Sequence, residues 1–302
     1  MQEYTTFVKF AKVTITLLFV LFATLFLSAP TVFMQSFLKG LAVWAQNVLP
    51  ALFPFAVLTP LALKFFPETK RSLCAKLFGV RADGAYLASL LCGYPVGAKA
   101  VSESNLDEET CTQMCSFCSS ASPVFVIVTV GGLLGNDAAT AVLAVSHLLS
   151  TLLNGLLYRA KRNCHAKADG AKPFASRDVG NALTSAVLSV LLVGGLIALF
   201  FMLIDMTKSL LPQSVGKTAA LGFAFGLLEM TSGVISVCET CETFAATVLC
   251  CFLISFGGTC VFAQSMTFLA KRNVKPQKFL QMKATQGAIA TLLGFALGKI
   301  FL

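Results

Sequence analysis

Apolar runs close to twenty residues long recur along this 302-residue chain, and they constrain its fold more than any other feature. A helix of about twenty apolar residues spans a hydrocarbon core about 30 Å thick. Charged residues make up only 12% of the chain, against about a quarter in a typical soluble domain. The pattern predicts an all-α polytopic membrane protein.

The basic residues indicate how the chain is oriented. The net charge is +9, and the positive charges gather in three short segments, Lys64 to Arg81, Arg159 to Arg177 and Lys271 to Lys283. Basic loops beside membrane helices tend to lie in the cytoplasm. Because the charges are divided among loops, nucleic acid is not an expected partner. The expected partner is the lipid bilayer.

The first apolar run, Thr14 to Val32, has no clear small-residue cleavage site after it. We therefore expect a retained helix rather than a cleaved signal peptide. Lys9 and Lys12 precede the run and put the N-terminus in the cytoplasm. The expected location is the cell membrane, as a multi-pass protein.

Eleven cysteines raise the question of a metal or redox site. Cys115 and Cys118 have C-x-x-C spacing, as do Cys238 and Cys241, and Cys111 lies one helical turn before the first pair. Most cysteines lie in apolar runs, where they act as small packing residues. A metal site at these five is the weaker interpretation, because the chain has only two histidines. No cofactor is expected.

The two halves of the chain resemble each other. "GYPVGAKAVSE", which starts at Gly93, aligns with "EMTSGVISVCE", which starts at Glu229, so that Gly97 matches Gly233. The order of elements also matches: a plain helix, a Gly-broken segment, a long interrupted helix and a plain helix. The predicted organisation is an N-terminal helix (1–34), a first repeat (35–158), a basic loop (159–178) and a second repeat (179–302).

The apolar runs and their breaks predict nine further elements after the first helix. If these elements cross the membrane in order and the basic loops lie in the cytoplasm, the orientations are consistent only when each Gly-broken segment is a re-entrant hairpin. The two halves would then be an inverted-topology repeat, as in many secondary transporters. The elements are an interfacial helix at Met34–Val48 anchored by Trp44, a membrane helix at Pro50–Phe66, Gly-broken segments at Ala82–Glu103 and Thr218–Glu239, interrupted helices at Asp107–Gly135 and Cys241–Ala270, and plain helices at Asp137–Tyr158, Val179–Asp205 and Gln281–Leu302.

The first broken segment is too short on each side of its break to span a membrane. Ala82 to Cys92 would form about 16 Å of helix, roughly half of the hydrocarbon core. Gly93 and Gly97 permit a reversal, and Pro95 stops the helix. A turn at this depth must be buried in protein or face water, so it is expected to line a cavity. The alternative is an ordinary helix with a kink.

Two charged residues lie inside apolar sequence. Lys99 would need a partner, water or a substrate at membrane depth, although it could also reach the surface or pair with Glu103. Glu229 is the single charge in its run. It could hold a proton or a cation, or balance Lys99. Thr231 and Ser232 place hydroxyl groups beside it.

The interrupted helices predict an anion site. Ser122 is a suitable N-cap and Pro123 a suitable first helical residue, and Thr259 would be the cap in the second half. Half-helices that begin at these breaks would direct free N–H groups to the membrane centre. The alternative is that the small residues serve close helix packing. The candidate substrate site comprises Gly93, Tyr94, Pro95, Gly97, Lys99, Ser119, Ser120, Ser122, Pro123, Glu229, Thr231, Ser232, Gly233, Gly257, Gly258, Thr259 and Gln264.

Four motifs carry a resemblance to a known family: "GYPVGAK" from Gly93, "SSASPVF" from Ser119, "GLLEMTSG" from Gly226 and "SFGGTCVFAQ" from Ser255. They resemble the YlbJ-type sporulation integral membrane proteins, of the nucleoside-recognition or Gate superfamily. The resemblance implies a transporter-like membrane protein. In spore formers it implies movement of dipicolinate, a small aromatic dianion, and a place in the outer forespore membrane.

The leading hypothesis is a secondary transporter or facilitator of a small organic anion. Lys99 and the half-helix ends would hold the anion, Glu229 would couple protons or act as a gate, and the coupling ion would be H⁺ or Na⁺. Two alternatives remain: a Gate-type permease for a metal ion or nucleoside, and a membrane scaffold that moves nothing. An enzyme is not expected, because no HExxH or GxSxG element occurs. Homo-oligomerisation and other membrane-protein partners are left open.

Overall fold

The computed structural model describes residues 16–17, 19–65, 72–104, 106–159, 176–212 and 218–302, which form helices and no strand. Lys9, Lys12 and most of the predicted basic loop lie outside these ranges. The helices are α2 Pro30–Val43, η1 Trp44–Val48, α3 Leu49–Phe65, α4 Leu73–Phe78, α5 Asp83–Cys92, α6 Val96–Glu103, α7 Glu108–Met114, η2 Phe125–Val130, α8 Gly131–Leu134, α9 Asp137–Leu157, α10 Ser176–Ser209, α11 Ala219–Gly226, α12 Met230–Thr240, α13 Thr243–Phe256, α14 Gly258–Leu269, η3 Ala270–Arg272 and α15 Pro276–Phe301.

Within the described residues, five helical segments are long and apolar enough to cross a membrane. This confirms the prediction of an all-α polytopic membrane protein. The five segments are Pro30–Leu61, Asp137–Leu157, Arg177–Ser209, Thr243–Arg272 and Pro276–Phe301.

The predicted first helix is wrong at its C-terminal end. A short apolar helix, Phe19–Ser28, stops before Ala29, and α2 begins at Pro30. Proline fits the first turn of a helix because its missing N–H would have no intrahelical partner there. The sequence therefore starts a new helix at Pro30, where we had expected the first helix to continue to Val32.

The separate interfacial and membrane helices predicted around Pro50 are also wrong. α2, η1 and α3 follow one another without a gap. η1 is a π-helical turn in which the N–H of Leu49 bonds the carbonyl of Trp44, and such bulges let a helix absorb a local irregularity. The Trp44 ring packs against α10, where a Cβ added to Gly194 would lie 2.7 Å from it; its role as an interfacial anchor stays a prediction.

The first Gly-broken segment is a helical hairpin rather than a kinked helix. α5 ends at Cys92, and Gly93 has a left-handed φ of 73° that favours glycine. α6 then packs back along α5, because a Cβ added to Gly97 would lie 2.7 Å from the Ser89 Cβ. That this hairpin re-enters a membrane stays a prediction.

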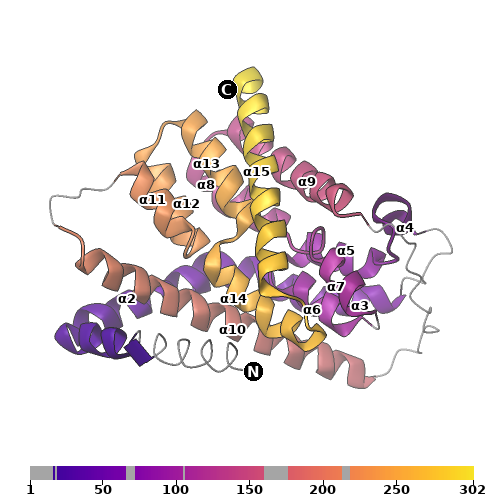
Figure 1. Ribbon diagram of the computed structural model, residues 1–302, viewed down its shortest axis with the longest axis horizontal. Coiled ribbons are helices and arrows are strands. Elements are labelled where there is room, and N and C mark those ends of the chain that lie inside the picture. The colour runs from indigo at the N-terminus through magenta and orange to yellow at the C-terminus, as the bar shows by residue number, and fades with distance from the viewer. Residues whose placement is uncertain (1–15, 18, 66–71, 105, 160–175, 213–217) are drawn as a thin grey trace, which may run out of the picture.

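The second Gly-broken segment forms a hairpin from α11 and α12. A Cβ added to Gly233 would collide with the backbone of Gly226, and one added to Gly222 would lie 2.6 Å from the Ser236 Oγ. Both pairs join one arm to the other. In Figure 1, the two hairpins lie on opposite sides of α15, with α11 and α12 at the left and α5 and α6 at the right.

Both long interrupted helices are broken where the sequence predicts. In the first, α7 is followed by turns before the helix resumes at Pro123 and continues through η2 and α8. In the second, α13 and α14 are separated at Gly257 and Gly258, whose φ angles are 88° and 73°. These left-handed angles are favourable for glycine and costly for other residues.

The remaining helices complete two groups. α10 packs lengthwise against α2 and α3, along the lower edge of Figure 1, and α9, α13 and α15 pack against one another. The prediction that the last helix begins at Gln281 is wrong by more than a turn, because α15 begins at Pro276. Lys283 ends the third basic segment and is the third residue of that predicted helix, and it packs inside the protein.

Candidate functional site

The two hairpin tips and the two helix breaks meet at one place. A Cβ added to Gly93, at the tip of the first hairpin, would lie 2.5 Å from the backbone nitrogen of Ser122 in the first break. The hydroxyl of Tyr94 donates to the carbonyl of Ile254 at 3.1 Å, in the last turn of α13. The tip of the second hairpin lies against Gly258. The breaks predicted from sequence thus form a single site.

The N-terminus of α14 is occupied by the second hairpin. The backbone N–H groups of Thr259 and Cys260 donate to the carbonyls of Leu227 and Leu228, each at 2.8 Å. The Thr259 hydroxyl also donates to Leu228, at 3.1 Å. Thr259 is therefore not the helix cap that we predicted, because the N-cap position is Gly257 and the hydroxyl acts as a donor. These three hydrogen bonds fasten the hairpin tip to the break.

The first break is capped as predicted. The Ser122 Oγ accepts a hydrogen bond from the N–H of Phe125 at 3.2 Å, and Pro123 starts the helix. The N–H of Ala121 donates to Nε2 of His147 at 3.1 Å. Because Nε2 accepts, Nδ1 carries the proton and donates to the Ser255 Oγ at 2.8 Å. A neutral His147 thus joins the first break to the end of α13.

Glu229 lies at the start of α12 and binds the free end of that helix. Its side chain is 2% exposed, and its two carboxylate oxygens accept from the N–H groups of Thr231 at 2.9 Å and Ser232 at 2.7 Å. A helix N-terminus carries a partial positive charge that stabilises an anion. The second hairpin therefore contains an anion site, and the protein's own carboxylate fills it.

A small cavity lies where these groups meet. Its volume is about 50 Å³, which has room for ordered water but not for an aromatic solute. Its walls combine polar groups with apolar side chains from both halves. Five of the predicted substrate residues line it: Tyr94, Ser122, Glu229, Thr231 and Gln264.

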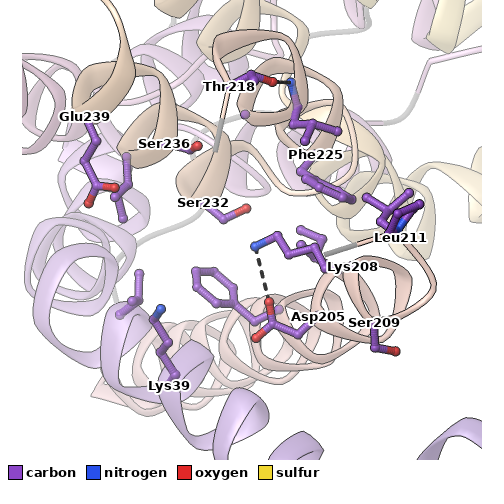
Figure 2. Close-up of a pocket in the computed structure, with 17 residues that line it drawn as sticks. Lys39, Asp205, Lys208, Ser209, Leu211, Thr218, Phe225, Ser232, Ser236 and Glu239 are labelled. Atoms are coloured by element: carbon purple, nitrogen blue, oxygen red, sulfur yellow. Dashed lines mark hydrogen bonds and ion pairs between the residues drawn. The ribbon is translucent and has the colours of Figure 1, made fainter. Parts of the chain in front are cut away.

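A second cavity of about 580 Å³ lies between α10 and the second hairpin. Figure 2 shows Lys39, Asp205 and Lys208 lining it together with Ser232, Ser236 and Glu239 of α12. Asp205 and Lys208 form an ion pair of 3.3 Å. Because Ser232 lines this cavity while its N–H binds Glu229, the N-terminal turn of α12 separates the two cavities.

Lys99 does not lie with the other predicted residues. Its ammonium group is 4.0 Å from a carboxylate oxygen of Glu103, whose side chain is 67% exposed. Lys99 is not among the residues that line either of these two cavities. Of the alternatives raised from the sequence, the pair with Glu103 describes this contact.

The lysine at the site is Lys283, which we did not predict. It is 2% exposed. Its ammonium donates to the Tyr94 hydroxyl at 2.8 Å, to the Ser119 carbonyl at 2.8 Å and to Gln286 Oε1 at 2.6 Å. Helical spacing could have found it, because Phe279, Lys283 and Gln286 recur on one face and all three are buried.

Most other predicted residues hold the elements together. Ser120 donates to the Ser89 carbonyl at 3.2 Å. Gly97 lies against Ser89 and the carbonyl of Cys118, where a side chain would collide. Pro95 precedes the first turn of α6, and its peptide bond with Tyr94 is cis. These residues shape the backbone around the cavity rather than line it.

The cysteines fall into separate apolar clusters. Cys111, Cys115 and Cys118 pack with Cys74, whereas Cys238 and Cys241 pack in the cluster around α13. Within the described ranges, no group of three or more His, Cys, Asp or Glu side chains is arranged to hold a metal ion. The structure therefore offers no geometry for the metal interpretation.

The chain is 24% identical to the sporulation integral membrane protein YlbJ of Bacillus subtilis (strain 168), over 90% of this chain and 79% of that protein. The resemblance to the YlbJ-type family is confirmed. No family model and no solved structure matches the chain. The similarity to YlbJ supports an integral membrane protein related to sporulation proteins, consistent with the spanning helices.

Proposed function

We propose that this protein is a secondary transporter of a small organic anion, in which a substrate carboxylate replaces the carboxylate of Glu229. The observation that carries the proposal is the pair of hydrogen bonds from Thr231 and Ser232 to Glu229. Two N–H groups at a helix N-terminus suit any carboxylate. Gln264 lines the same cavity and offers a further polar contact.

Protonation of Glu229 is the step that would release its side chain. A protonated carboxyl group has one oxygen that donates, so it can no longer accept equally at both oxygens. The N–H groups of Thr231 and Ser232 would then be open to a substrate carboxylate. Proton and substrate would bind together, which makes H⁺ the coupling ion.

Transport would also require the small cavity to widen. The hydrogen bonds from Thr259 and Cys260 to Leu227 and Leu228 hold the tip of the second hairpin in place. Movement of α11 and α12 would break them and join the small cavity to the larger one beyond Ser232. With the basic loops in the cytoplasm, the larger cavity opens towards the outside.

Dipicolinate is the first substrate to test. It carries two carboxylates on one aromatic ring, and the similarity to a sporulation membrane protein makes it a relevant solute. One carboxylate would take the place of Glu229. The ring would lie among Tyr94, Phe125 and Met230, which line the same cavity. The cell membrane or, in a spore former, the outer forespore membrane is the location that this role requires.

Uptake into proteoliposomes tests the proposal. Labelled dipicolinate is supplied with and without an inward proton gradient to the wild type, to Glu229→Gln and to Glu242→Gln, a matched change at an exposed carboxylate. We expect the gradient to accelerate uptake by the wild type and by Glu242→Gln. Glu229→Gln should lose that acceleration, because the amide cannot exchange a proton.

Two results would contradict the proposal. Absence of uptake for dipicolinate and a panel of other small carboxylates would remove the transport function and favour a scaffold. Gradient-driven uptake that is unchanged in a folded Glu229→Gln variant would remove the role of Glu229. Uptake of a nucleoside or a metal ion in place of carboxylates would support the other permease hypothesis.

A further inference from the structure

The hydrogen-bond partners of Lys283 match the three donors of a charged ammonium. It makes three hydrogen bonds, to a hydroxyl, a backbone carbonyl and an amide oxygen. An ammonium has three donors, whereas a neutral amine has two donors and a lone pair. The centroid of the Tyr94 ring lies 4.8 Å from the Lys283 nitrogen.

The orientations of the partners support this assignment. The Thr151 hydroxyl donates to the carbonyl of His147 at 3.0 Å, so it accepts from Nε2 of Gln286 at 2.9 Å. This places Oε1 of Gln286 towards Lys283. The Tyr94 hydroxyl likewise donates to the carbonyl of Ile254, which leaves its oxygen to accept from Lys283.

Through these contacts Lys283 reaches carbonyl groups at both helix breaks. The Ser119 carbonyl, which it binds directly, follows the turns that end α7. The Ile254 carbonyl, which it reaches through Tyr94, lies in the last turn of α13. The Ile254 carbonyl carries the partial negative charge of a helix C-terminus, and Ser119 lies in unwound backbone. In transporters with broken helices, carbonyls of both kinds coordinate the coupling Na⁺ or H⁺.

We propose that the Lys283 ammonium is a fixed cation in the place where a mobile coupling cation would bind. It stabilises the carbonyl groups of both breaks permanently, so no Na⁺ or K⁺ is needed to complete the site. The coupling role rests on the proposed transport function, whereas occupation of the cation site does not. Lys283 acts here as a positioning residue, since it lies behind Tyr94 and is not among the residues that line the small cavity.

Thermal stability of the purified protein in detergent tests the cation site without any transport assay. Wild type, Lys283→Met, Lys283→Arg and the exposed control Lys278→Met are each heated in NaCl, KCl or choline chloride at equal ionic strength. We expect Na⁺ or K⁺ to raise the melting temperature of Lys283→Met by about 2–4 °C over choline. The other three proteins should show no difference between the salts.

Replacement of NaCl by choline chloride in the uptake assay gives the second readout. Wild-type uptake should be unchanged, and any uptake that remains in Lys283→Met should become dependent on Na⁺ or K⁺. The inference is overturned if the wild type needs Na⁺, or if folded Lys283→Met is insensitive to small cations. Should Lys283→Met fail to fold, Na⁺ dependence of the wild type still decides. Failure of all carboxylate uptake removes the proposed function, while the melting temperatures still test the cation site.

Discussion

The tips of the two hairpins lie next to buried groups of opposite charge. In the first half, the hairpin tip carries Tyr94, whose hydroxyl accepts a hydrogen bond from the buried Lys283 of α15. In the second half, the hairpin tip carries Glu229, a buried carboxylate bound to the N–H groups of its own helix. The comparison teaches that similar backbones can hold different chemistry: the first tip is fixed to a cation, and the second ends at an anion that a substrate can replace.

The largest expected effect comes from disrupting the close contact between the arms of the second hairpin. Gly233→Ala places a methyl group against the backbone of Gly226, which cannot move away as a flexible side chain could. We expect a loss of about 2–4 kcal/mol of stability and loss of uptake. Gly195→Ala is the matched control, because nothing lies within 4 Å of the added carbon. Equal melting temperatures for the two variants would contradict the tight hairpin.

Changes of intermediate effect should distinguish the hydrogen bond that fastens the tip of the second hairpin from the N-cap of the first break. Thr259→Val removes the hydrogen bond to Leu228, and Ser122→Ala removes the cap on Phe125. Each change should cost about 1 kcal/mol. Only Thr259→Val should make uptake faster, because it loosens the tip that must move. Equal uptake rates in the two variants would mean that the hairpin tip does not limit transport.

The smallest effect concerns the helices that lead to the two breaks. Asp107 caps α7 by accepting from the N–H and hydroxyl of Thr110, whereas Glu242, at the same position before α13, makes no side-chain cap. Asp107→Ala should therefore cost about 0.5–1 kcal/mol, and Glu242→Ala close to nothing. Denaturation of both variants in detergent measures the difference.

This effect should also depend on pH. The hydrogen bonds from Thr110 hold the pKa of Asp107 below its ordinary value. A lowered pKa in the folded state stabilises the protein fully above the unfolded pKa of about 3.9. The stabilisation is lost as the pH falls through the folded pKa. The cost of Asp107→Ala should thus be constant near neutral pH and shrink below about pH 4; a constant cost down to strongly acidic pH would contradict the cap.

Local sequence signals predicted the breaks well. Glycine and proline act on their own backbone, so Gly93, Pro95, Pro123 and Gly257 mark turns without reference to the rest of the fold. Glu229 could also be predicted as a site residue, because a single charged residue inside a membrane-spanning run usually has a functional role. The predicted breaks and the predicted carboxylate therefore lie together in the structure.

Contacts between distant segments account for what the sequence did not show. The partners of Lys283 lie 189 residues away at Tyr94 and 164 residues away at Ser119. In the sequence, Lys283 ends the basic segment that begins at Lys271, so it was counted among the charges that orient the chain. The contact of the Trp44 ring with Gly194 could not be predicted for a similar reason, since it depends on the packing of α10.

Proton exchange during substrate binding tests the central claim most directly. Calorimetric titration of the purified protein with dipicolinate, in buffers of different ionisation enthalpy, gives the number of protons taken up per substrate. If a substrate carboxylate replaces that of Glu229, the wild type should take up about one proton at neutral pH, and Glu229→Gln should take up none. Binding without proton uptake in the wild type, or equal proton uptake in Glu229→Gln, would contradict the account.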